Sequence, residues 1–243
     1  MTYLLLLLGA AAAARAAPRL VLVGETGAGK STLGNRLLGR GAFAVGGGFD
    51  AVTAAVRCEA GRWRGRPVEV CDTPGFNDDG RRDGDTAAAI LSVANGTAGL
   101  VYVHNARAAR LSRSARRAMK LVVAGISSDG GAPPPVGRVA FVLTRSLGGL
   151  DGPLWRRQLP PALCAKFGAC AAPPTLAFAG VGRAAVDAAA LVAPRFRRAF
   201  GAWLDAVSRE APLAAAAPPA DAGAAACDAQ EAKWRACVAA TNT

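Results

Sequence analysis

The eight residues GETGAGKS at positions 24–31 are the feature that most constrains how this chain folds. They form a complete G-x-x-x-x-G-K-[ST] motif, with an apolar run at residues 20–23 before it and a helix-compatible segment at residues 32–38 after it. The glycines let the backbone curl so that successive N–H groups point inward at phosphate groups. The loop also leads into a helix N-terminus, where the helix dipole favours anions. The sequence therefore predicts a strand, a phosphate-binding loop and a helix, in that order.

The positions of this loop have different expected roles. Lys30 is expected to reach the β- and γ-phosphates of a nucleotide, and the Ser31 hydroxyl to ligate Mg²⁺. The residues that we predict to contact the nucleotide at the loop are Glu25, Thr26, Gly27, Ala28, Gly29, Lys30, Ser31 and Thr32.

A second motif, D-T-P-G, follows the hydrophobic run at residues 68–71. Asp72 is suited to hold the Mg²⁺ shell, and Gly75 can offer its backbone N–H to a γ-phosphate and move when that phosphate leaves. Thr53, just before a predicted strand, is the candidate to complete the metal shell through its hydroxyl. We therefore predict Ser31, Thr53 and Asp72 as metal ligands, and Lys30, Thr53 and Gly75 as catalytic residues.

Apolar runs of strand length alternate with helix-compatible segments along the chain, which predicts an α/β fold. The expected strands are residues 19–23, 52–60, 67–72, 98–104, 138–144 and 175–178. The expected helices are residues 30–38, 86–95, 111–124, 154–167 and 186–208.

The length of 243 residues, 52% of them hydrophobic, is enough for one domain with a sizeable core and a tail. We predict an apolar leader or targeting segment at residues 1–17, a nucleotide-binding domain at residues 18–210, and an Ala/Pro-rich linker with a short helical tail at residues 211–243. None of the six cysteines forms a C-x-x-C pair, so a zinc ribbon is not expected. Cys58 and Cys71 are interpreted as small core residues.

The net charge of +12 would ordinarily suggest a nucleic-acid or membrane partner. However, the chain is crowded with Ala, Gly, Arg and Pro, whose codons are GC-rich, so genome base composition accounts for much of this charge. The arginines are also scattered, apart from clusters at residues 107–117 and 195–198. We therefore expect no nucleic-acid partner and leave peripheral membrane association open.

The N-terminus allows two interpretations. Residues 3–14 are apolar and residues 14–17 resemble a small-residue cleavage site, but no basic region precedes them and the stretch is too short to span a bilayer. Because nucleotide-dependent switches need the nucleotide of the cytosol or of an organelle stroma, we expect a cytoplasmic location. Targeting to an organelle or to the secretory pathway is the alternative.

Several segments together resemble the immunity-associated GTPases (the GIMAP/IAN family), which belong with the septins and the chloroplast-import receptor GTPases. They are residues 22–39, Val52-Thr53, residues 70–76, residues 100–103 with 110–112, and residues 141–145. The resemblance implies a Ras-like P-loop NTPase with a mostly parallel six-stranded sheet and helices on both faces. It also implies GTP/GDP and Mg²⁺ binding, slow hydrolysis, nucleotide-dependent self-association through the nucleotide face, and base contacts by Thr144 and Arg145.

Two positions depart from this pattern. Leu147 stands where the family has an aspartate that faces the guanine ring, so guanine specificity depends on a rearrangement that brings in Asp151. Phe76 stands where Ras-type enzymes have a water-orienting glutamine, which predicts a feeble hydrolase. An arginine from a second copy, with Arg107 and Arg110 as candidates, would then assist hydrolysis.

We therefore predict a GTP-binding switch with weak Mg²⁺-dependent GTPase activity that forms a homodimer or larger oligomer. The alternatives are a receptor-like or trafficking GTPase at an organelle membrane, a degenerate nucleotide-binding interaction module, and an ATP-using P-loop enzyme. The D-T-P-G motif argues against the last of these.

Overall fold

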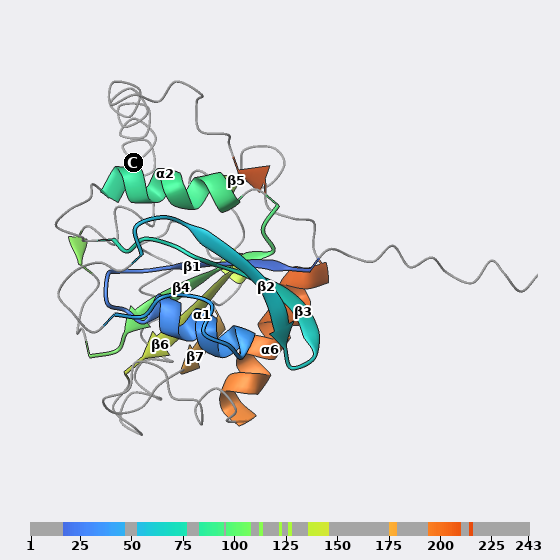
Figure 1. Cartoon of the computed structure of the whole chain (residues 1–243). Coiled ribbons are helices and arrows are strands. Elements are labelled where there is room, and N and C mark those ends of the chain that lie inside the picture. Colours follow the sequence, from blue (N-terminus) through green and yellow to red (C-terminus); the bar gives the residue numbers. More distant parts are fainter. Residues whose placement is uncertain are drawn as a thin grey trace, which may run out of the picture.

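A six-stranded sheet forms the centre of the protein, with strand order β2-β3-β1-β4-β6-β7 (Figure 1). The computed structural model describes residues 17–46, 53–76, 83–94, 96–107, 112–113, 122, 126–127, 136–145, 175–178, 194–209 and 214–215. Adjacent strands pair in parallel, except that β2 runs antiparallel to β3. The predicted α/β fold with a mostly parallel six-stranded sheet is therefore confirmed. The strands are β1 (Arg19–Val23), β2 (Arg57–Trp63), β3 (Arg66–Asp72), β4 (Gly99–Asn105), β6 (Val139–Thr144) and β7 (Thr175–Phe178).

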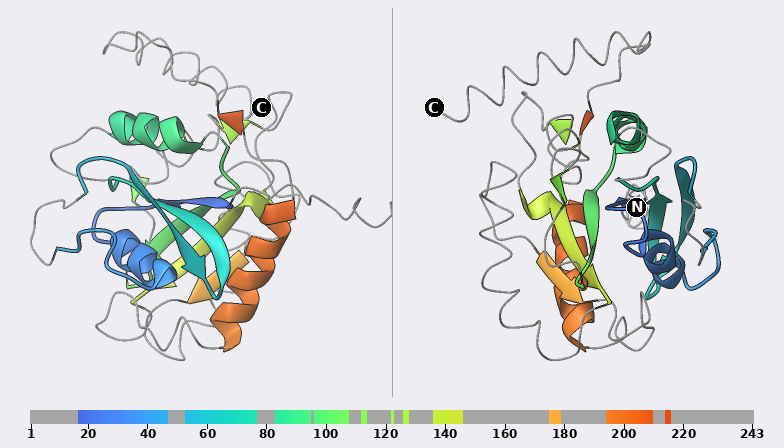
Figure 2. Two further views of the ribbon diagram at one scale, coloured as in Figure 1. Left: turned by 45° about the vertical axis from the view of Figure 1, so that its right-hand side comes forward. Right: turned by 90° about the vertical axis from the view of Figure 1, so that its left-hand side faces the viewer.

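Helices cover both faces of this sheet (Figure 2). On one face, α1 (Lys30–Leu38) and α6 (Pro194–Arg209) pack over a cluster of buried apolar side chains. On the other face, α2 (Asp83–Ala94) covers a second cluster. The central strands β1, β4 and β6 have buried apolar residues on both faces, as parallel strands between two helix layers require. The described part also contains a 3₁₀ turn, η1 (Val136–Arg138), and a small antiparallel pair of β5 (Ile126–Ser127) and β8 (Ala214–Ala215).

The predicted bounds of β1, β7 and α1 are confirmed, and those of β3, β4 and β6 are confirmed to within one residue. The strand expected at residues 52–60 is wrong in position, because β2 begins only at Arg57 and continues to Trp63. The helix expected at residues 86–95 begins three residues earlier, at Asp83. The helices expected at residues 111–124 and 154–167 lie almost wholly outside the described residues, as do the leader and most of the tail.

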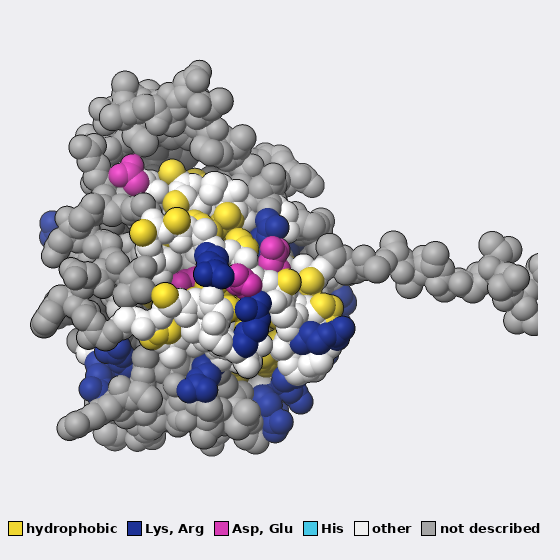
Figure 3. All heavy atoms as spheres, in the orientation of Figure 1, with side chains coloured by type: hydrophobic (Ala, Val, Ile, Leu, Met, Phe, Trp, Pro, Cys, Tyr) yellow, Lys and Arg dark blue, Asp and Glu magenta, His cyan; other side chains and the backbone are white. Residues whose placement is uncertain are grey.

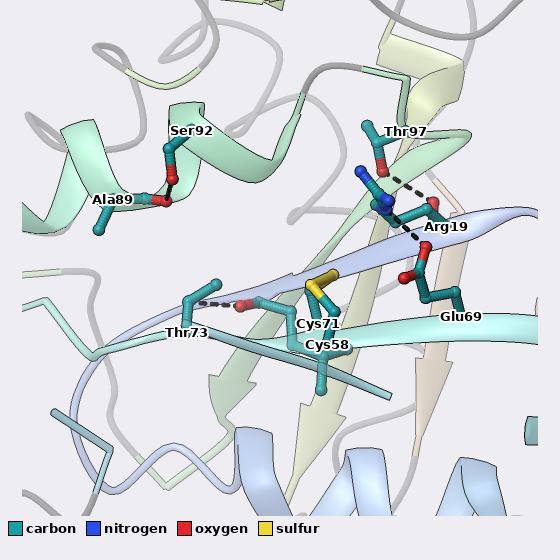
Figure 4. The surroundings of a disulfide bond; sticks show 9 residues. Arg19, Cys58, Glu69, Cys71, Thr73, Ala89, Ser92 and Thr97 are labelled. Atoms are coloured by element: carbon teal, nitrogen blue, oxygen red, sulfur yellow. Dashed lines mark hydrogen bonds and ion pairs between the residues drawn. A yellow bond between two sulfur atoms is a disulfide. The ribbon is translucent and has the colours of Figure 1, made fainter. Parts of the chain in front are cut away.

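The β2–β3 hairpin turns through Arg64 and Gly65, whose φ angles of 52° and 81° suit a two-residue hairpin loop. This turn places Cys58 directly opposite Cys71, and the two form a disulfide (Figure 4). Cys71 is a fully buried core residue, as expected, and Cys58 packs against the same cluster, partly buried. The bond between their sulfur atoms was not predicted.

Asn35 of α1 fixes the loop that follows the helix. Its Oδ1 accepts hydrogen bonds from the N–H groups of Ala42 (2.8 Å) and Phe43 (2.7 Å), and its Nδ2 donates to the Phe43 carbonyl (2.8 Å). We expect Asn35→Ala to lower the free energy of unfolding by about 2 kcal/mol, because two backbone donors lose their partner. Denaturant unfolding checks this, and Asn35→Asp, which keeps both acceptor bonds, should lose about half as much. An Asn35→Ala protein as stable as the parent would contradict this role.

Candidate functional site

The loop between β1 and α1 has the backbone that its glycines predict. Gly24, Gly27 and Gly29 have φ angles of 152°, 74° and 98°, and Gly29 is the N-cap of α1. L-residues with side chains rarely adopt such angles, so the curl of the loop depends on these glycines. Of the other predicted nucleotide contacts in the loop, Glu25 and Thr32 are partly exposed, Thr26 is exposed and Ala28 is buried.

Lys30 is the first residue of α1 and is only 6% exposed. Its Nζ donates hydrogen bonds to the carbonyl oxygens of Gly24 (3.1 Å) and Glu25 (3.0 Å). The backbone at the start of the loop thus fixes the position of the Lys30 ammonium group. A positive charge fixed beside a helix N-terminus is suited to bind an anion such as a phosphate group.

The three predicted metal ligands lie together, although they come from three segments of the chain. Asp72, at the end of β3, accepts hydrogen bonds at Oδ2 from Ser31 Oγ (2.7 Å) and Thr53 Oγ1 (3.1 Å), and the two hydroxyl oxygens are 3.3 Å apart. Asp72 is 1% exposed, and its Oδ1 has no hydrogen-bond partner among the described residues. A buried carboxylate oxygen without a partner is costly unless a cation joins it. Two hydroxyls and a carboxylate are hard oxygen donors of the kind that Mg²⁺ prefers, so these residues fit a magnesium ion.

The protonation of Asp72 gives a test of this arrangement. Burial raises the pKa of Asp72 above its ordinary value of 3.8, while hydrogen bonds from Ser31 and Thr53 and the charge of Lys30 act in the opposite direction. The folded protein therefore binds this proton more tightly than the unfolded chain does. Consequently the contribution of Asp72 to stability falls as the pH rises from 3.8 through the raised pKa.

We expect the Asp72→Asn variant to lack this decline. In chelator, it should be as stable as the parent or more stable at neutral pH, because no buried charge remains. Mg²⁺ should raise the unfolding temperature of the parent and leave that of the variant unchanged. Thermal unfolding between about pH 4 and pH 7, with and without Mg²⁺, measures both effects. A variant clearly less stable than the metal-free parent at neutral pH would show that burial is not the dominant influence on Asp72.

The backbone of the D-T-P-G segment lies against the phosphate-binding loop. Phe76 donates its N–H to the Gly24 carbonyl (3.1 Å) and accepts at its own carbonyl from the Thr26 N–H (2.9 Å). A β-carbon added to Gly75 would overlap the Thr26 hydroxyl and lie 2.5 Å from the Thr26 backbone nitrogen. The Phe76 side chain is fully buried in the cluster beneath α2. Its ring therefore points into the core and offers no group to a reacting water.

On the opposite side of the loop, β6 ends at Thr144, one of the two predicted base contacts. Thr144 Oγ1 donates to the Ala28 carbonyl (2.7 Å) and lies 3.2 Å from the His104 carbonyl, so it ties β6 to the loop. Arg145 has a φ of 53° and is partly buried. Leu147 and Asp151, which bear on guanine recognition, lie outside the described residues.

Sequence reasoning missed Thr73. Its hydroxyl donates to the Leu22 carbonyl (2.6 Å) and so ties the start of the D-T-P-G segment to β1. The available signal was a small hydroxyl side chain directly after a strand-ending aspartate. Taken together, the structure gathers Lys30, Ser31, Thr53, Asp72 and Gly75 around one loop at the carboxyl ends of β1 and β3. This is where open α/β sheets bind ligands.

Comparison with known proteins finds relatives in sequence and in fold. The sequence model of the AIG1 family matches residues 18–124, just under half of the chain, and confirms the resemblance to immunity-associated GTPases. Human GTPase IMAP family member 8 is 44% identical over 54 residues, which are 22% of this chain and 8% of that protein. This chain thus matches only a small part of that relative's length.

Solved structures share the fold. Toc33 from Arabidopsis thaliana, in complex with GDP and Mg²⁺, superposes with a TM-score of 0.63 at 14% identity, over 82% of this chain and 88% of that one. A structure of the chloroplast translocon components atToc33 and psToc159, whose dimerization is described as important for their GTPase activity, gives the same TM-score at 16% identity. It covers 82% of this chain and 86% of the other. At these identities the likeness establishes the Ras-like P-loop fold.

Proposed function

We propose that this chain is a GTP-binding switch with slow, Mg²⁺-dependent GTPase activity. The observation that carries the proposal is the Ser31–Thr53–Asp72 cluster beside the buried Lys30, with one carboxylate oxygen left without a described partner. The match to the AIG1 family and the fold shared with a GDP- and Mg²⁺-bound protein support GTP/GDP and Mg²⁺ as the ligands.

Each of these groups has a role in hydrolysis. Lys30 and the loop amides stabilise negative charge on the β- and γ-phosphates, and Gly75 offers its backbone N–H at the γ-phosphate. Ser31, Thr53 and Asp72 hold Mg²⁺, which supplies neutralisation of phosphate charge when bound. Since the Phe76 ring is buried, position 76 provides no water-orienting group. Hydrolysis by the isolated chain should therefore be slow.

We further propose self-association through the nucleotide face, with an arginine supplied by a second copy. Arg107 supports this, because it is exposed just after the carboxyl end of β4, the strand next to β1. Arg110, the other candidate, lies outside the described residues. The dimerization described for the chloroplast translocon components supports the same arrangement.

Single-turnover hydrolysis measured across protein concentrations tests this self-association. The rate constant should rise with concentration and level off as the dimer forms, because an arginine supplied in trans accelerates such reactions by orders of magnitude. Arg107→Ala should flatten the curve while leaving nucleotide affinity unchanged. A rate constant independent of concentration in the parent would exclude an arginine in trans.

We propose a cytoplasmic location, with targeting to an organelle or to the secretory pathway as the alternative; the alternative function is that of an organelle-membrane receptor or trafficking GTPase. Among the described residues, no helix has the length and apolar character to cross a bilayer. Arginines are scattered over the face shown in Figure 3, with acidic side chains among them, and Arg40 and Arg57 both pair with Glu59. This distribution supports the proposal that nucleic acid is not the partner.

Binding of fluorescently labelled GTP, GDP and ATP, with and without Mg²⁺, tests the proposed function on the chain from residue 18 onward. A preference for GTP that strengthens with Mg²⁺ would support it despite Leu147. Equal binding of ATP would favour an ATP-using P-loop enzyme. Absence of binding by all three would favour the degenerate interaction module.

A further inference from the structure

The Cys58–Cys71 disulfide joins β2 to β3 close to two proposed metal ligands: Asp72 ends β3, and Thr53 precedes the first residue of β2, Arg57, by four residues. Cys71 directly precedes Asp72, and Cys58 follows Thr53 by five residues. We infer that this pair is a reversible redox site. Oxidation by a disulfide co-reactant links β2 to β3 and so holds Thr53 close to Asp72, whereas reduction by thiols breaks this link and lets the two residues separate more easily. The inference deepens the proposed function and rests on it for the consequence at the nucleotide.

The bond lies at the open end of the hairpin, away from its turn. At the turn end, Trp63 is buried and packs edge-on against Phe200 of α6 (ring centroids 5.3 Å apart). At the site end, Arg57 opposite Asp72 is the last pair of the ladder, and Cys58–Cys71 is the pair next to it. Strand ends open first, and β2 is an edge strand of the described sheet, in which it pairs with β3 alone. Without the disulfide, opening would start at the end that positions Thr53.

The two sulfur atoms differ in access. Cys71 is fully buried among side chains beneath α2, whereas Cys58 is only partly buried at the margin of that cluster. Ala60, two residues further along β2 and hence on the same face as Cys58, is exposed, so the covering layer ends close to Cys58. An incoming thiolate therefore reaches the Cys58 sulfur first.

Reduction then proceeds by two exchange steps. A thiolate of a small-molecule thiol attacks Cys58 Sγ, forming a mixed disulfide, while the Cys58–Cys71 bond breaks and its electron pair passes to the Cys71 sulfur, which takes up a proton. A second thiolate attacks the outer sulfur of the mixed disulfide and releases Cys58 as a thiol. Two electrons pass from the two small thiols to the protein, and the two small molecules leave joined as one disulfide. Oxidation is the reverse sequence, with that disulfide as the oxidant.

The test uses the full chain with Cys164, Cys170, Cys227 and Cys237 changed to Ser, so that Cys58 and Cys71 are the only cysteines left. The matched control carries Cys58→Ser in addition. Both proteins are equilibrated in buffers of varied reduced-to-oxidised glutathione ratio. Three quantities are measured: free thiols by alkylation and mass spectrometry, amide hydrogen exchange at residues 53–58 without nucleotide, and release of fluorescent GDP in Mg²⁺.

We expect the free thiols to change reversibly between none and two. Amide exchange at residues 53–58 and GDP release should each be about tenfold faster in the reduced form, and the control should behave as the reduced form in every buffer. A thiol content that does not respond to glutathione, or equal amide exchange in both forms, would overturn the inference. Equal GDP release from both forms would also overturn the inference, but it would not contradict the proposed binding of nucleotide. If GDP binds to neither form but amide exchange still responds, the redox site stands and the proposed function fails.

Discussion

Replacement of Lys30 by alanine should reduce GTP affinity by about 100- to 1,000-fold, the largest effect on binding that we expect from one side chain. The Lys30 ammonium is held by the Gly24 and Glu25 carbonyls at 3.1 and 3.0 Å, so its position is fixed before any nucleotide arrives. The substitution removes this preorganised charge and leaves both carbonyls without that donor. Equilibrium binding of labelled GTP and GDP in Mg²⁺ measures the loss.

Two further variants make this result specific. Lys30→Met keeps the length of the buried stem but removes the charge, so it should fold and still lose most of the affinity. Arg40→Ala removes an exposed cation just after α1, where Arg40 pairs with Glu59, and should change affinity by less than about twofold. If Lys30→Met bound GTP as the parent does, the ammonium group would not be a phosphate ligand.

Replacement of Gly24 by alanine should lower the free energy of unfolding by at least about 4 kcal/mol, the largest effect on stability that we expect. A β-carbon at this position would overlap the carbonyl oxygen of Val103 and lie 3.2 Å from its carbonyl carbon. Val103 belongs to β4, which is bonded to β1 on one side and β6 on the other, so its backbone cannot move aside. The φ of 152° adds a conformational cost for any side chain.

Gly39→Ala is the matched control, since Gly39 also has a positive φ, of 68°, but a β-carbon there would meet nothing within 4 Å. It should cost only about 1 kcal/mol, the conformational part of the effect. Denaturant unfolding of both variants separates the two contributions. Equal losses for Gly24→Ala and Gly39→Ala would show that the close approach of the loop to β4 does not limit stability.

The sequence predicted best where the chain is locally determined. The apolar run of β1 and the glycines and lysine of the loop lead directly into α1, and their bounds were correct. The strand β2 was misplaced because residues 52–56 include β-branched side chains, whereas β2 itself is R-C-E-A-G-R-W, a poor strand sequence by propensity. Pairing with β3 and the burial of Trp63 determine where it lies, and both depend on distant residues.

The disulfide was missed for a related reason. Cys58 lies six residues before Arg64 and Cys71 six residues after Gly65, so a two-residue turn at Arg64-Gly65 makes them partners. The turn was not predicted, and the pairing therefore could not be. By contrast, the residues expected at the metal site came from motifs with known spacing to strand ends. The sequence could not show that Asp72 Oδ1 lacks a hydrogen-bond partner among the described residues, since that depends on every group packed around it.

The burial of Phe76 also limits how far the D-T-P-G segment can travel. Gly75 is a mobile position in switches of this class, but here the next residue is anchored by a fully buried ring and by two backbone hydrogen bonds to the loop. Extracting that ring costs about 2–3 kcal/mol, which holds any widely open form to roughly 1% of molecules. If the chain is the switch proposed above, movement of this segment after phosphate loss would be restricted by the anchored Phe76. The structural difference between the two nucleotide states that a partner would detect would then be small.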